Sequence, residues 1–259
     1  MSVITLLTDF GTRDYFVGAM KGVILSINPE ALIVDITHEI EPQQISSASF
    51  TLASCYKNFP SRTIHLAVVD PGVGSDRRAI LVETREHYFI APDNGLLDFV
   101  FEETSNFRVF ELTEKKYFLP EVGCTFHGRD VFAPVAAHLS RGVAPGDFGR
   151  EIDDFVRLTN IAPRKISETE ISGEILHIDR FGNLITNFKN ENLPAKFCVE
   201  VKGKSVARHQ KYYAEAAAGE VFSIEGSAGF LEIAAFYSSA AKILRASVGQ
   251  RIKLRILAE

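Results

Sequence analysis

The sequence TIHLAVVDPG, residues 63–72, runs from apolar strand-forming residues straight into a tight acidic turn. A continuous apolar run of this length is typical of a strand that is buried on both faces, as in a parallel sheet. Asp70 follows the expected strand at 63–69, and the Pro71-Gly72 pair ends it. The stretch therefore predicts an α/β sheet with an acidic residue at the carboxyl end of one strand.

Strand and helix patterns alternate on either side of this stretch. Apolar residues at helical spacing predict a helix that starts near Tyr15 and ends at Asn28-Pro29. The other elements expected in this half are strands at 3–7, 32–36, 79–83 and 88–91 and helices at 43–57 and 130–139. Such alternation predicts an N-terminal, mainly parallel sheet that is covered by helices.

The pattern changes in the second half of the chain. Short alternating runs separated by glycines predict strands at 171–178, 197–201, 220–224, 230–233 and 251–257. These strands indicate a smaller, mostly antiparallel β-domain. We therefore expect an α/β domain over residues 1–160, a polar linker over 161–168 and a β-domain over 169–259.

The composition excludes several classes of protein. The 259 residues carry a net charge of −5 and no block of Lys and Arg, so we expect no nucleic-acid partner. No apolar run approaches the roughly 18 residues that span a bilayer, and the first residues lack the pattern of a secretory signal. Three widely spaced cysteines indicate reduced thiols. We expect a cytoplasmic protein with no membrane partner.

Three common kinds of site are not predicted. The seven histidines form no His-x-His or His-x-x-x-His pair, and no Cys/His cluster has ligand spacing, so we expect no metal. The Gly-x-Ser-x-Gly turn of serine hydrolases does not occur. The strand at 3–7 is not followed by the glycine fingerprint of a dinucleotide-binding fold.

Two acidic residues stand where ligands usually bind in α/β proteins, outside the carboxyl ends of the strands. Asp9 follows the strand at 3–7 and Asp70 follows the strand at 63–69, each with a glycine two residues later. Glycine lets the backbone approach a ligand closely. The alternative is that both motifs are plain turns whose carboxylates cap backbone N–H groups.

Two further motifs carry polar side chains. The segment DPGVGSDRR, residues 70–78, lacks the features of a phosphate loop, so one of its arginines is expected to pair with Asp70, with Arg78 at the surface. In FHGRD, residues 126–130, we expect Asp130 to cap a helix. His127 is either a structural hydrogen-bonding group or a group that positions a small nucleophile.

The segment HIDRFGNLITN, residues 177–187, gathers a carboxylate, an aromatic ring and an amide around one glycine. The ring of Phe181 can stack on a base, and the amide of Asn183 offers a purine edge a donor and an acceptor together. The alternative is a β-turn with Asn183 in a left-handed conformation. A second small-residue turn, GSAGFLE at 226–232, is either part of a binding site or a plain hairpin.

Together these segments resemble the S-adenosylmethionine hydroxide adenosyltransferase family, which is related to fluorinating and chlorinating enzymes that act on the same substrate. The matching stretches occur in the family's order and cover nearly the whole chain. They are LLTDFG at 6–11, VDITH at 34–38, VDPGVG at 69–74, FHGRD at 126–130 and DRFGNLITN at 179–187. The resemblance implies hydrolysis of S-adenosyl-L-methionine to adenosine and methionine, without a metal or other cofactor.

The same resemblance implies a homotrimer with each site between the N-terminal domain of one subunit and the C-terminal domain of the next. The first domain would carry the water-activating set, and the second would supply adenine and methionine contacts. The implied roles are water activation for Asp70, Arg77 and His127, ribose binding for Asp9, methionine ammonium binding for Asp14 and Asp179, adenine contact for Phe181 and Asn183, and methionine carboxylate contact for Ser227.

Two other functions fit part of the pattern. A halogenase of the same group would attack with chloride or fluoride, whereas the presence of Asp70, Arg77 and His127 together favours water. A non-catalytic sensor of an adenosyl ligand would need the binding residues but no reactive set. The chain also departs from the family near the methionine end, where it has Gly226-Ser227 in place of the frequent Asn-Ser.

Overall fold

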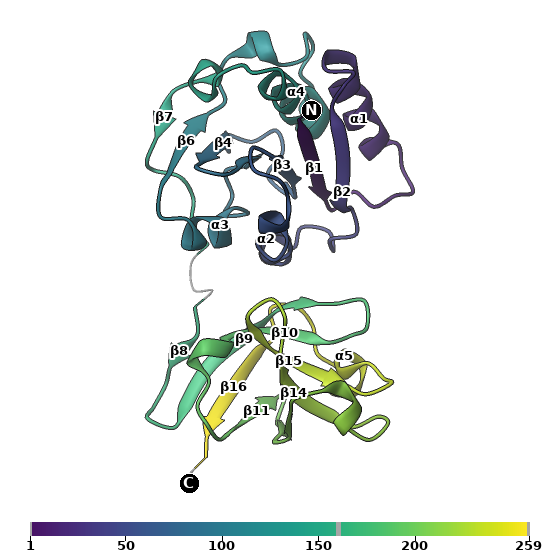
Figure 1. Ribbon diagram of the computed structural model, residues 1–259, viewed down its shortest axis with the longest axis vertical. Coiled ribbons are helices and arrows are strands. Elements are labelled where there is room, and N and C mark those ends of the chain that lie inside the picture. Colours follow the sequence, from purple (N-terminus) through teal and green to yellow (C-terminus); the bar gives the residue numbers. More distant parts are fainter. Residues whose placement is uncertain (1, 159–161, 258–259) are drawn as a thin grey trace. The chain divides into compact units, whose positions relative to one another are not determined.

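The computed structural model describes residues 2–158 and 162–257, and the chain divides into two compact units between residues 158 and 159 (Figure 1). The end of the expected first domain, residues 159–160, and the first residue of the expected linker, residue 161, lie outside the described residues. Within the rest of the expected linker, β8 (Arg164–Lys165) pairs with β9 (Glu170–Ile178).

The first unit is built on one seven-stranded sheet with the order β2-β1-β3-β5-β4-β6-β7. Neighbouring strands from β2 to β5 are parallel, and the pairs from β5 to β7 are antiparallel. The strands are β1 (Val3–Thr8), β2 (Leu32–Thr37), β3 (Ile64–Val68), β4 (Ala79–Thr84), β5 (Tyr88–Pro92), β6 (Phe107–Glu111) and β7 (Glu151–Ile152).

Helices cover both faces of this sheet (Figure 1). They are α1 (Phe16–Ile27), α2 (Ile45–Ala53), α3 (Asp98–Glu103) and α4 (Ala133–Ser140). Successive side chains of a strand point to opposite faces, so Leu66 joins the core that contains α1 and α4, whereas Ala67 joins the core that contains α2 and α3. Burial on both faces explains why β3 is apolar along its whole length.

Two predicted helices differ from the observed ones. The helix expected at 43–57 is the shorter α2, because Cys55 leaves the helical region with φ −132° and the chain tightens into the 3₁₀ turn Tyr56–Asn58. The helix expected at 130–139 begins as a π-helical turn, Gly128–Phe132. The α-helix α4 starts directly after this turn. In this unit the strands β6 and β7 and the helix α3 were not predicted.

The second unit is a mostly antiparallel sheet with the strand order β12-β11-β16-β9-β10-β15-β14-β13. Only the pair β13 and β14 is parallel among the described strands of this unit. Beyond β8 and β9, its elements are β10 (Leu184–Lys189), β11 (Phe197–Val201), β12 (Lys204–Val206), β13 (His209–Gln210), β14 (Val221–Glu225), β15 (Phe230–Ala235), β16 (Arg251–Ile256) and the helix α5 (Ala240–Leu244). The predicted α/β fold class, with a parallel-type sheet first and an antiparallel one second, is confirmed.

No helix among the described residues is long and apolar enough to cross a membrane.

The core of the first unit contains a buried imidazole pair. The Nδ1 atom of His65 lies 2.8 Å from Thr5 Oγ1, and its Nε2 lies 3.4 Å from Nδ1 of His87. The ring of His65 also stacks on Phe89 at 5.1 Å between centroids. Burial, and then the neighbouring His87, lower the pKa of His65 to about 3. The folded state therefore holds this ring neutral.

This pair predicts acid sensitivity of the fold. An unfolded His65 would take up a proton below about pH 6.5, whereas the folded one does not until about pH 3. As the pH is lowered from 6.5 to about 3, the free energy of unfolding should therefore decrease. This residue contributes a slope of up to about 1.4 kcal/mol per pH unit. Chemical denaturation from pH 7 to pH 4 measures this. H65Q should flatten the slope and H209Q, at an exposed position, should not; equal slopes in wild type and H65Q would contradict it.

Candidate active site

Asp9 and Asp70 leave neighbouring strands at the same edge of the first sheet. Thr8 of β1 is the register partner of Val68 of β3, so the two carboxylates follow adjacent parallel strands. Burial raises the pKa of Asp9, and the negative charge of Asp70 adds to this. A hydrogen bond of 3.0 Å from the Gln43 N–H to Asp9 Oδ2 opposes the rise. The edge therefore carries two carboxylates, and the charge of Asp70 acts on Asp9.

Arg77 is the arginine that pairs with Asp70. Its Nε donates to both carboxylate oxygens at 2.9 Å, and its Nη2 donates to Oδ2 as well. Both side chains are nearly buried, with 5% of Asp70 and 11% of Arg77 exposed. Arg77 also lies over the ring of Phe132, with Cζ 5.3 Å from the centroid. A planar guanidinium with a forked contact fixes the carboxylate in one orientation.

The loop between these two residues is tightly folded. The hydroxyl of Ser75 donates to the Gly72 carbonyl at 2.7 Å and accepts from the Arg77 N–H at 3.3 Å. Gly74 has φ +79°, and a Cβ there would collide with the Cys124 carbonyl. Only glycine meets both conditions. The loop thus brings Arg77 back over the strand end that carries Asp70.

His127 completes this group, because its Nδ1 lies 2.9 Å from Nη2 of Arg77. A guanidinium can only donate, so Nδ1 of His127 accepts and the ring proton is on Nε2. Burial and then the positive charge of Arg77 lower the pKa of His127, although Asp70 and a hydrogen bond to the Gly123 backbone act in the opposite direction. The imidazole is therefore neutral at neutral pH.

The π-helical turn after His127 is held by Asp130, which was wrongly expected to cap the helix. Its side chain is fully buried, where it accepts from the Gly123 N–H at 2.9 Å and pairs with Arg129 at 2.6 Å. The carboxylate therefore ties the preceding loop to the turn. A Cβ on Gly128 would press against Phe10, Phe126 and Met20, so this position is tightly packed.

Two predictions about neighbouring residues have different outcomes. Arg78 was expected at the surface, but it is only 21% exposed and pairs with Asp93 at 2.7 Å and Asp154 at 2.6 Å. The surface prediction is wrong, because the buried Asp93 draws one side of the Arg78 guanidinium inward, while the exposed Asp154 pairs with the other. Asp14 is exposed in the loop before α1, and no hydrogen bond or ion pair fixes its carboxylate within residues 2–158.

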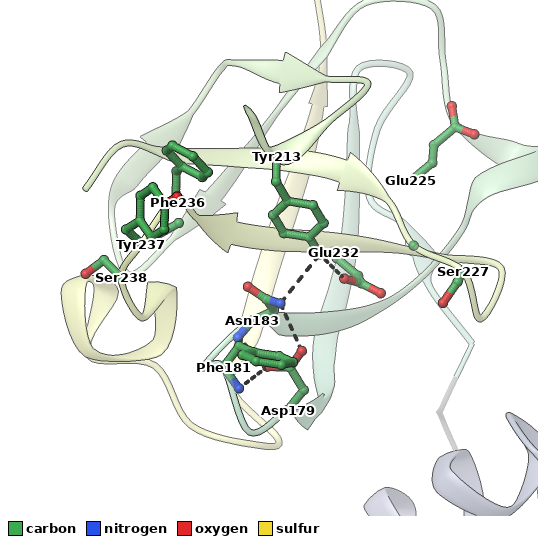
Figure 2. A pocket seen from close by; sticks show the side chains of 12 residues that line it. Asp179, Phe181, Asn183, Tyr213, Glu225, Ser227, Glu232, Phe236, Tyr237 and Ser238 are labelled. Carbon is green, nitrogen blue, oxygen red and sulfur yellow. Dashed lines mark hydrogen bonds between the residues drawn. The ribbon is translucent and has the colours of Figure 1, made fainter. Parts of the chain in front are cut away.

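A cavity of about 930 Å³ lies in the second unit (Figure 2). It gathers four residues that the sequence singled out, namely Asp179, Phe181, Asn183 and Ser227. Tyr213 and Glu232 also line it, together with an exposed aromatic residue, Tyr237.

One chain of hydrogen bonds crosses this cavity. Asp179 Oδ1 accepts from the N–H groups of Phe181 at 2.9 Å and Asn183 at 2.8 Å, and its Oδ2 accepts from Asn183 Nδ2 at 2.9 Å. The same Nδ2 lies 3.5 Å from the hydroxyl of Tyr213, which in turn donates to Glu232 Oε2 at 3.2 Å (Figure 2). Because Asp179 can only accept, the amide of Asn183 points its nitrogen toward it. Its oxygen, Oδ1, has no hydrogen-bond partner among residues 162–257 and is left for a ligand.

The carboxylates of Asp179 and Glu232 bring two negative charges together along this series of hydrogen bonds. Burial, then the charge of and hydrogen bond to Glu232, raise the pKa of Tyr213 to about 12. Burial also raises the pKa of Glu232; the bond from Tyr213 opposes this, and the charge of Asp179 adds to it. A ligand that brings positive charge or hydrogen-bond donors would be stabilised here.

The turn that carries Phe181 has one obligatory glycine. Gly182 has φ +84°, and a Cβ there would overlap Ser239. The turn interpretation placed Asn183 in the left-handed conformation, and this is wrong. The left-handed residue of the turn is Gly182. Phe181 is 76% exposed, so its ring is free to contact a flat ligand.

Tyr213 and Glu232 were not predicted as site residues. Glu232 lies in the quoted turn segment 226–232, but the pattern does not show that it faces Tyr213. Tyr213 sits in a polar stretch whose place opposite Asn183 depends on the fold of β13, β14 and β15. Ser227 is exposed in the turn between β14 and β15. No group of three or more His, Cys, Asp and Glu side chains suited to a metal ion occurs among the described residues.

Comparison with known proteins covers both units. The SAM hydroxide adenosyltransferase N-terminal domain matches residues 4–149, and the corresponding C-terminal domain matches residues 173–253. A protein of Methanocaldococcus jannaschii named (R)-S-adenosyl-L-methionine hydrolase is 37% identical over 98% of this chain and 96% of its own. A fluorinase of Actinoplanes is 29% identical over 74% of this chain and 73% of its own.

A crystal structure of an uncharacterized conserved protein from Thermotoga maritima is similar in fold, with a TM-score of 0.88 and 37% identity over 97% of this chain and 99% of that one. Matches of this extent, in both units, show the family. The chain belongs to the SAM hydroxide adenosyltransferase family.

Proposed function

We propose that this protein hydrolyses S-adenosyl-L-methionine to adenosine and L-methionine, in the (R) form for which relatives such as the M. jannaschii protein are named. The observation that carries the proposal is the Asp70–Arg77–His127 group at the carboxyl edge of the first sheet. A pre-arranged carboxylate and guanidinium at such an edge suit the binding and activation of a small nucleophile.

The reaction needs no redox step. The oxygen of water attacks the ribose C5′ in line with the C5′–S bond, that bond breaks, and its electron pair stays on sulfur. The sulfonium thereby becomes the neutral thioether of methionine, and the water loses one proton. Holding water and C5′ in line lowers the barrier by up to about 7–11 kcal/mol. We propose that no metal or other cofactor takes part.

Each member of the group has a distinct role in this proposal. Asp70 takes the proton, because its carboxylate has acceptor capacity beyond the bonds from Arg77. Arg77 faces the hydroxide-like oxygen as it forms, since no acceptor contacts its Nη1 among residues 2–158. His127 holds Arg77 through Nδ1 and so orients the water through the guanidinium, because its two ring nitrogens are engaged by Arg77 and the Gly123 backbone.

The remaining site residues bind the substrate. We propose that Asp9 holds the ribose hydroxyls and that Phe181 and Asn183 contact adenine. Asp14 and Asp179 would face the methionine ammonium and Ser227 its carboxylate. The half-buried Asp9 beside Asp70, and the gathering of the four second-unit residues at one cavity, support this assignment.

We propose a cytoplasmic homotrimer in which the first unit of one subunit and the second unit of the next build each site. The reactive group and the cavity residues belong to different compact units, which is consistent with a site that is completed by a neighbouring chain. The first unit would carry the water-activating group, and the second would supply the adenine and methionine contacts.

Isotope labelling tests the reaction. A mixture of the (R) and (S) epimers of S-adenosyl-L-methionine is incubated with the protein in ¹⁸O-labelled water without halide, and the products and the remaining epimers are analysed by mass spectrometry and chromatography. We expect adenosine with the label at O5′, unlabelled methionine, and consumption of the (R) epimer. Methylthioadenosine, a need for halide with a 5′-halo-nucleoside as product, or no product would contradict the proposal.

Loss of the Arg77 guanidinium should affect turnover more than binding. We expect R77A to lower kcat by about 10²–10³-fold, because a donor to the developing oxyanion is lost. The dissociation constant for S-adenosyl-L-methionine should change far less. R77K keeps a positive charge beside Asp70 but lacks the forked guanidinium, so its kcat should lie between those of R77A and the wild type. R85A, at a position 91% exposed, is the control. Weaker binding of R77A with unchanged kcat would show that Arg77 has no part in the reaction step.

The orientation of the Asn183 amide predicts base selectivity. Its free Oδ1 accepts from the 6-amino group of adenine but would face the 6-oxo oxygen of hypoxanthine, leaving both acceptors unpaired. Adenosine should therefore bind about tenfold or more tightly than inosine. N183A should remove most of this preference. Calorimetric titration with the two nucleosides measures it, and equal affinities in the wild type would disprove the orientation.

A further inference from the structure

A chain of polar contacts, buried at Thr8 and His38, runs behind the turn that carries Asp9. His38 follows β2, and its Nδ1 lies 2.9 Å from the hydroxyl of Thr8, the last residue of β1. Its Nε2 lies 3.1 Å from Oδ1 of Asp35. The Thr8 hydroxyl also accepts from the Phe10 N–H at 3.2 Å. None of these contacts belongs to the Asp70–Arg77–His127 group.

The donors and acceptors of this chain fit one arrangement. The Phe10 N–H can only donate, so the Thr8 oxygen accepts from it. An ionised Asp35 carboxylate lies 3.1 Å from Nε2 of His38 and has no proton to donate, which favours the ring proton on Nε2. Nδ1 is then an acceptor and takes the hydroxyl proton of Thr8. The hydrogen bonds therefore run from the Phe10 N–H through Thr8 to His38, and Asp35 faces the other ring nitrogen at 3.1 Å without the geometry of a hydrogen bond.

An acid, an imidazole and a hydroxyl in this order also form the reactive groups of many hydrolases. Burial excludes that role here, because Thr8 is 0% exposed and His38 is 4% exposed. The hydroxyl cannot reach a substrate. The effect of the chain must therefore be on the backbone to which it is bonded.

That backbone is the turn around Asp9. The His38 carbonyl accepts from the Gly11 N–H at 2.7 Å, while its ring holds Phe10 through Thr8. His38 thus fixes the chain before and after Asp9. Asp35 anchors the ring from the other side and pairs with Lys21 at 2.6 Å. Burial raises the pKa of Asp35, but the contacts with Lys21 and His38 outweigh this and keep the pKa below its usual range. Asp35 therefore stays ionised and acts as an acceptor.

We propose that His38 is a positioning residue that sets the Asp9 carboxylate for the ribose hydroxyls of the substrate. The inference rests on the role proposed for Asp9. It predicts that removal of the Thr8 hydroxyl weakens recognition of the ribose specifically, because Asp9 keeps its charge but is no longer held in one position.

The variant T8V removes the hydroxyl and keeps the shape of the side chain, and T8S restores the hydroxyl. The matched control is T5V, since Thr5 lies on the same strand with 0% exposure and also bonds a buried imidazole, that of His65, at 2.8 Å. Adenosine and 2′,3′-dideoxyadenosine are titrated by calorimetry, and KM and kcat are measured with S-adenosyl-L-methionine.

We expect wild type, T8S and T5V to prefer adenosine, and T8V to lose about tenfold of this preference. KM of T8V should rise more than its kcat falls. A merely structural role would lower the melting temperature of T8V and T5V alike and leave the preference intact in both, which would overturn the inference. No ribose preference in the wild type would overturn it as well. A wild type that prefers adenosine but does not turn over the substrate would contradict the proposed function and not the role of His38.

Discussion

The ion pair between Asp70 and Arg77 is the contact on which the site depends. A carboxylate that is 5% exposed is costly to bury unless a partner neutralises it and satisfies its oxygens. Arg77 does both, but only because the loop turns back over the strand end, which needs the left-handed Gly74. The remaining guanidinium N–H groups then dictate the proton position on His127. One buried charge thus determines the loop, the arginine and the histidine tautomer.

Much of the fold follows from local pattern. The apolar β3 and the helical spacing of α1 appear in the sequence almost as they do in the structure, because burial of these elements requires that pattern. The parallel pairing of β1 and β3 then places Asp9 and Asp70 together without further information. The shorter α2 could not be predicted, since its end at Cys55 depends on backbone angles that several residue types allow. The π-helical turn at 128–132 also lacked a local signal.

In the site, too, contacts between residues close in sequence could be predicted, whereas contacts between distant residues could not. Contacts between residues that are near in sequence were within reach, such as the turn formed by Asp179 and Asn183, four positions apart. Which arginine pairs with Asp70 was open, because both neighbours carry the same charge. Tyr213 could not be found, since its hydroxyl meets Asn183 across 30 positions and depends on strand order in the second sheet.

Gly226 makes two positions of the second unit dependent on each other. A Cβ at 226 would occupy the place of the Glu232 carboxylate, so a larger residue there would push Glu232 away from Tyr213. Glu232 is long and flexible, so the fold would tolerate the change at low cost. The loss would appear in the cavity instead, where the tyrosine hydroxyl would lose its acceptor. The two positions should therefore be exchanged together when such cavities are redesigned.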